Sequence, residues 1–64
     1  MNYALVILTP DGMRVLPFTA RNDNHAVLLA MITTGAVGIT FACEVWRYED
    51  GRTIGEPLAA KHAE

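Results

Sequence analysis

This sequence of 64 residues has no serine and a single cysteine, Cys43. A single cysteine cannot form a disulfide within the chain, and the apolar neighbours of Cys43 indicate a buried thiol that packs as a small hydrophobe. The histidines that could bind a metal, His25 and His62, lie far from each other and from Cys43 in sequence. Small domains without disulfides or metals usually gain stability by associating with a partner, so association is what we expect here.

Charged residues are also few. They make up 19% of the chain, against 52% hydrophobic residues, and the seven acidic and five basic side chains give a net charge of −2. This composition is too hydrophobic for a disordered chain. The basic residues are scattered, with no stripe that could follow a phosphate backbone, so we do not expect direct binding to nucleic acid.

Long hydrophobic runs are absent. The run that begins at Ala4 ends before Thr9, and no basic segment precedes it. It is too short for the core of a signal peptide and far too short to span a bilayer. We therefore expect no membrane segment and a cytoplasmic protein.

The patterning that is present predicts four strands and one helix in the order ββαββ, an α+β fold. Asn22 is a favourable N-cap, and Gly35 is a residue type that often follows the end of a helix. The predicted helix covers about 23–34, and the predicted strands cover 3–9, 13–19, 37–48 and 52–56.

Turn residues and prolines predict how the strands pair. The segments Pro10–Gly12 and Glu49–Gly51 each suit a three-residue hairpin loop. Pro17 cannot donate a ladder hydrogen bond, which places the second strand at one edge of the sheet, and the short fourth strand belongs at the other. The result is a four-stranded antiparallel sheet in the order 2-1-3-4, with the helix packed on one face. We expect residues 1–57 to form this single domain and 58–64 to form a frayed C-terminal tail.

The middle of the predicted helix has no polar side. Leu28, Met31 and Ile32 lie on its flanks, and polar residues occur only at its ends. A helix that is apolar all round is normally buried all round. One four-stranded sheet cannot bury every side of a helix, so we expect a homodimer, with a larger protein partner as the other possibility.

No catalytic motif is visible in the sequence. The two arrangements with any chemical potential are His25 beside Asp23 and a facing pair of Glu44 and Glu56. A solvated helix start and solvated strand charges are the better interpretations of these residues. We therefore expect no catalytic, metal-binding or cofactor-binding residue.

The segment Trp46-Arg47-Tyr48 has the residue types that dominate protein interfaces. With Leu28, Met31 and Ile32 it makes up the predicted interaction residues. These features favour a non-enzymatic protein–protein interaction module, a small regulator or inhibitor that covers a partner's surface. Phage- or mobile-element proteins that act on host complexes are one such class, an analogy that rests on the small size of the chain and its lack of catalytic motifs. The alternative is a dimeric module that binds a small ligand in an apolar interface pocket lined by Met31, Phe41 and Trp46.

Overall fold

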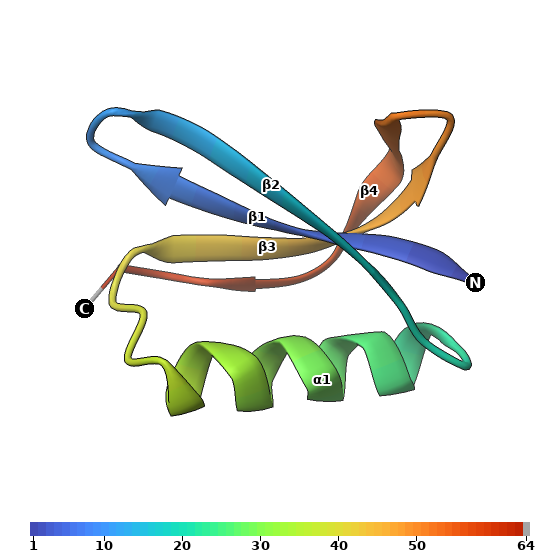
Figure 1. The fold of residues 1–64 in the computed structure, drawn as a ribbon, viewed down its shortest axis with the longest axis horizontal. Helices are drawn as coiled ribbons and strands as arrows, with labels where there is room; N and C mark the ends of the chain where they lie inside the picture. The colour runs from blue at the N-terminus through green and yellow to red at the C-terminus, as the bar shows by residue number, and fades with distance from the viewer. Residues whose placement is uncertain (64) are drawn as a thin grey trace.

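The computed structural model describes residues 1–63 and arranges them as two hairpins joined by a helix (Figure 1). The four strands form one antiparallel sheet in the order β2-β1-β3-β4. The predicted ββαββ fold and the predicted strand order are confirmed. The elements are β1 (Asn2–Thr9), β2 (Gly12–Thr19), α1 (Asp23–Ala36), β3 (Ala42–Glu49) and β4 (Arg52–Lys61).

The first hairpin has a two-residue loop, so the predicted three-residue loop is wrong. Thr9 pairs with Gly12, which leaves Pro10 and Asp11 as the loop. Proline presets the backbone for this tight turn, and Gly12 follows it with a φ of 135°, a conformation that favours glycine. The register of the whole hairpin shifts by one residue as a result.

The second hairpin also has a two-residue loop, because Glu49 pairs with Arg52. Asp50 and Gly51 between them have φ values of 53° and 78°. Positive φ at both central positions defines the type I′ turn, whose twist matches that of the two strands and which favours Asp-Gly.

β4 continues well beyond the predicted end of the fourth strand. Its pairing with β3 is interrupted between Val45 and Arg47. There, residues 55–58 of β4 lie opposite the single residue Trp46 of β3. This irregularity accommodates Pro57, which cannot donate to a ladder, and pairing then resumes from residue 59 to Lys61. The predicted tail is therefore wrong for 58–61, which belong to the strand. Residue 64, the end of that tail, lies outside the described residues.

The helix ends two residues later than predicted. The N–H of Gly38 donates to the carbonyl of Gly35 at 3.3 Å, and the N–H of Ile39 donates to that of Thr34 at 3.0 Å. Gly38 has a φ of 69°, so Gly38 is the left-handed residue that follows the helix end. The sequence had predicted Gly35 for this position. Because residues 37–41 form this helix end and a turn, β3 begins at Ala42 and not at Val37.

The core lies between α1 and one face of the sheet. Tyr3, Leu5 and Ile7 from β1 meet Cys43 and Val45 from β3 on this face. Figure 1 shows α1 running along this side of the twisted sheet, while the β1–β2 loop lies away from it. The other core members are Ala20, Ala26 and Ala30, with Phe18, Leu29, Ile39 and Leu58 packed against them.

At 14 residues, α1 is too short to cross a bilayer, and the described residues contain no other helix that could.

Candidate interaction surfaces

The helix turns its small side chains toward the sheet. Its buried residues are Ala26, Ala30 and Thr34, each four positions from the next. Side chains four apart lie above one another on one helix face, so this face is the one that packs on β1 and β3. Small side chains let the helix backbone approach the sheet, but they contribute little apolar burial.

Three large apolar side chains of the helix are exposed to solvent. Leu28, Met31 and Ile32 are 56%, 65% and 58% exposed, and we call these three residues the helix surface. At 100° per residue, Leu28 and Ile32 lie on the side opposite Ala30, and Met31 lies on the flank next to β3 and β4. The sequence predicted an apolar outer side of the helix, because the middle of the helix has no polar side, and the helix surface lies there.

An apolar cleft of about 360 Å³ lies between this flank of α1 and the strands β3 and β4. Met31 forms part of its wall, and Cys43 on β3 lies at its base, where burial raises the pKa of the thiol. Lys61 lines the cleft as well, and its Nζ donates to the carbonyl of Ile39 at 2.6 Å. The complete lining is Leu5, Ala30, Met31, Thr34, Gly35, Cys43, Val45, Ala59, Ala60 and Lys61.

A second apolar region lies on the opposite side of the sheet. Leu8 pairs directly with Met13, and Val15 follows two positions later on the same face of the first hairpin. All three side chains are exposed, Met13 by 64%, and we call them the sheet surface. The chain therefore presents apolar side chains on both of its broad sides.

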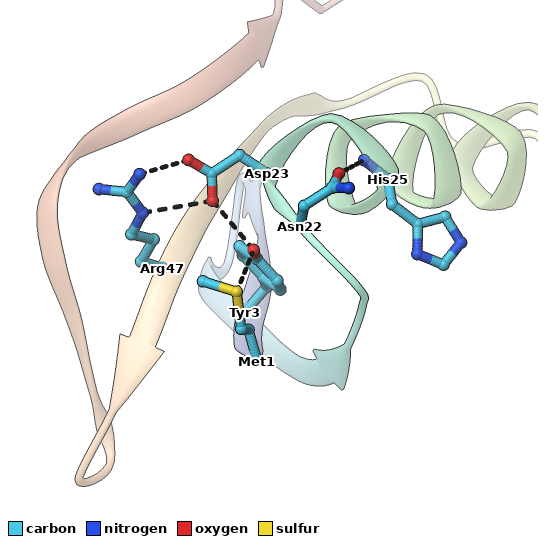
Figure 2. A network of polar contacts seen from close by, with 6 residues as sticks. All are labelled: Met1, Tyr3, Asn22, Asp23, His25 and Arg47. Carbon is cyan, nitrogen blue, oxygen red and sulfur yellow. Dashed lines mark hydrogen bonds and ion pairs between the residues drawn. The ribbon is translucent and has the colours of Figure 1, made fainter.

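A polar cluster joins the start of the helix to the sheet (Figure 2). The Tyr3 hydroxyl donates to Oδ1 of Asp23 at 2.9 Å. The Arg47 guanidinium donates to both carboxylate oxygens of Asp23, with Nε 3.4 Å from Oδ1. These donors hold the pKa of Asp23 below its usual range, Arg47 contributing most, while desolvation raises the pKa of Tyr3. The cluster fixes the first turn of α1 on β1 and β3.

This cluster was not predicted from the sequence. Its members lie 20 and 24 residues apart along the chain. The available signals were a tyrosine within an aliphatic strand and an acidic residue in the first helical turn. Neither identifies the other without knowledge of the strand register.

The structure does not form either of the two residue pairs that were weighed as possible acid–base pairs, His25 with Asp23 and Glu44 with Glu56. His25 Nδ1 accepts from the backbone N–H of Arg21 at 3.0 Å, and its ring points away from Asp23 in Figure 2. The carboxylate of Glu44 accepts from the Trp46 indole at 3.1 Å, and Glu44 pairs with residue 60 rather than residue 56. Among the described residues, no three His, Cys, Asp or Glu side chains are placed to hold a metal ion.

The predicted interaction residues lie on different sides of the molecule. Arg47 lies on the helix side of the sheet, bound to Asp23. Trp46 lies on the other side, next to Ala4 in the register, and alternation places Tyr48 there as well. Trp46 is thus on the far side of the sheet from Met31, so the two cannot line one pocket within a single chain.

Comparison with known proteins gave no match to any family model, curated protein or solved structure.

Proposed function

We propose that this chain is a non-enzymatic protein–protein interaction module, a small cytoplasmic regulator or inhibitor that acts by covering another protein's surface. One observation supports this proposal above all. Among the described residues, eleven large apolar side chains are exposed, whereas only five of the ten buried apolar residues are larger than cysteine. Six of the exposed side chains are grouped in the helix surface and the sheet surface, and grouped exposed apolar side chains of this kind are typical of interaction sites.

The energetic consequence follows from the size of the chain. A domain of this length has a marginal core, and each fully buried Leu, Ile, Met, Val or Phe side chain contributes about 1.5–3 kcal/mol. The exposed side chains therefore represent stabilisation that the isolated chain does not obtain. An interface that buries some of them would recover part of it.

The chemistry of the polar residues supports a binding role over catalysis. Tyr3 and Arg47 both donate hydrogen bonds to Asp23 and so hold α1 on the sheet. His25 accepts a hydrogen bond from a backbone N–H. Burial keeps the Cys43 thiol protonated near neutral pH, because it raises a pKa that nucleophilic cysteines need lowered.

The experiment is affinity capture from the source cells with three tagged forms: the wild type, Met31→Glu on the helix surface, and Met13→Glu on the sheet surface. The proposal predicts one protein retained in a fixed ratio by the wild type, which purified components then reproduce. Loss of that protein in one variant and not the other identifies the surface used. If the wild type, both variants and beads without the chain all recover the same proteins in equal amounts, the proposal is contradicted.

A module for small ligands is the second candidate, and the cleft beside α1 is the observation that favours it. Its volume of about 360 Å³ lies within the range of ligand pockets, and its lining is mostly apolar. Such a module would gain thermal stability with at least one compound of a metabolite panel. An interaction module would gain none, and its melting temperature would respond only to the partner protein.

A further inference from the structure

We propose that the helix surface is covered by a second copy of this chain, with the two α1 helices packed antiparallel about a two-fold axis near Ile32. This inference rests on the proposed function, in which the apolar surfaces are interfaces, and it names the partner for one of them. The sheet surface would then remain available to a larger protein.

The shape of the helix is self-complementary in this arrangement. Leu28, Ile32 and Gly35 follow one line along the side of α1 that faces away from Ala30. Gly35 leaves open space, since a Cβ built there would meet no atom within 4 Å. An axis near Ile32 places the large Leu28 of each copy against this gap in the other. Antiparallel helices with a large residue opposite a small one can approach closely.

The charge distribution also suits a self-interface. After Asp23, the helix carries no Asp, Glu, Lys or Arg as far as its end at Ala36. Asp23 itself is bound to Arg47 and Tyr3. Two copies of this surface therefore meet without repulsion between like charges, and antiparallel packing sets the positive end of each helix dipole beside the negative end of the other.

The exposed area is consistent with a missing copy. A compact monomer of 7.0 kDa has an accessible surface of about 4,000 Å². This chain exposes 4478 Å², an excess comparable to half of the roughly 800 Å² that one partner buries in a standard interface. Because the core of a chain of this length is marginal, a partner that is always present in equal amount would add stability. A second copy meets that condition by definition.

The first test compares two variants that are matched in residue type and exposure. Met31 is 65% exposed on the helix surface, and Met13 is 64% exposed on the sheet surface. Light scattering of purified protein is expected to give a dimer for the wild type and for Met13→Glu. Met31→Glu is expected to lose half of that mass or to unfold, because dimerisation would bury an unpaired charge. A wild-type dimer that survives Met31→Glu with its circular dichroism unchanged would overturn the proposed interface.

The second test does not depend on a variant that could unfold. In a Cys43→Ala background, Ile32→Cys places a thiol near the proposed axis, where mild oxidation at low micromolar concentration should link two copies quantitatively. Met13→Cys in the same background is the control and should stay unlinked. Equal linkage in both variants, or none at position 32, would overturn the proposal.

Failure of the second copy and failure of the interaction module give different experimental results. If the wild type is a folded monomer and a different protein is captured through Met31, the second copy is excluded while the interaction module stands. If the wild type is a folded monomer that captures nothing, both proposals fail.

Discussion

Two leucines of the chain differ in exposure and provide a quantitative test of the helix surface. Leu5 in β1 is 4% exposed, whereas Leu28 in α1 is 56% exposed. Complete burial of a leucine contributes about 1.5–3 kcal/mol. For an isolated chain, Leu28→Ala should therefore reduce the free energy of unfolding by about 1 kcal/mol, since less than half of the side chain is buried.

The structure predicts a clearly larger effect at Leu5. Leu→Ala substitutions in cores cost about 2–5 kcal/mol, depending on how much cavity remains. Leu5 lines the open clefts on both flanks of α1, so water can enter the space that the side chain leaves. We expect Leu5→Ala to fall at the lower end, about 2–3 kcal/mol. That is a large part of the stability of a 64-residue domain, about 3–10 kcal/mol.

If a partner covers the helix surface, Leu28 behaves as a buried residue. Leu28→Ala should then cost about 2–3 kcal/mol per chain, close to the effect of Leu5→Ala. The assay is urea unfolding followed by circular dichroism at protein concentrations of about 5 and 500 µM, since the stability of an associated chain depends on its concentration. A loss of about 1 kcal/mol or less for Leu28→Ala, with the same midpoint at both concentrations, would refute the reasoning.

Two further predictions concern the start of α1. The lowered pKa of Asp23 means that its ionised form stabilises the folded state; this contribution is complete above the usual pKa near 3.9 and is lost as the pH falls below it. Asp23→Asn should therefore flatten the acid limb of a stability–pH curve measured by thermal melting, and an unchanged limb would mean that the contact with Arg47 has no energetic effect. The side chain of Asn22 accepts from the His25 N–H at 2.8 Å. Asn22→Ala should lower the free energy of unfolding by about 1 kcal/mol in urea titrations, whereas Asn22→Asp should restore most of that loss.

Local chemistry was sufficient to predict the arrangement of the sheet. Pro17 has no N–H to donate, and β2 lies at the edge as predicted. The registers were not predictable, because Pro-Asp-Gly satisfies both a two-residue and a three-residue loop. The length of β4 was missed for a related reason: Gly55 and Pro57 read locally as a strand end, and only pairing with β3 around the irregularity restores the strand.

Of the candidate surfaces, one was predictable from local sequence and the others were not. The missing polar stripe predicted exposed Leu28, Met31 and Ile32, because periodicity alone determines which residues share a helix face. The sheet surface depends on the register that sets Leu8 against Met13, and the polar cluster depends on contacts between distant segments. Such features become visible only when the strands are paired.

Sedimentation equilibrium of the purified wild-type chain, from micromolar to millimolar concentration, decides whether the outward side of α1 is an interface. We expect a folded particle of about twice 7.0 kDa, or a heavier one where another protein has co-purified. A folded species of 7.0 kDa at every concentration, with nothing bound to it, would contradict the claim that the outward side of α1 is an interface.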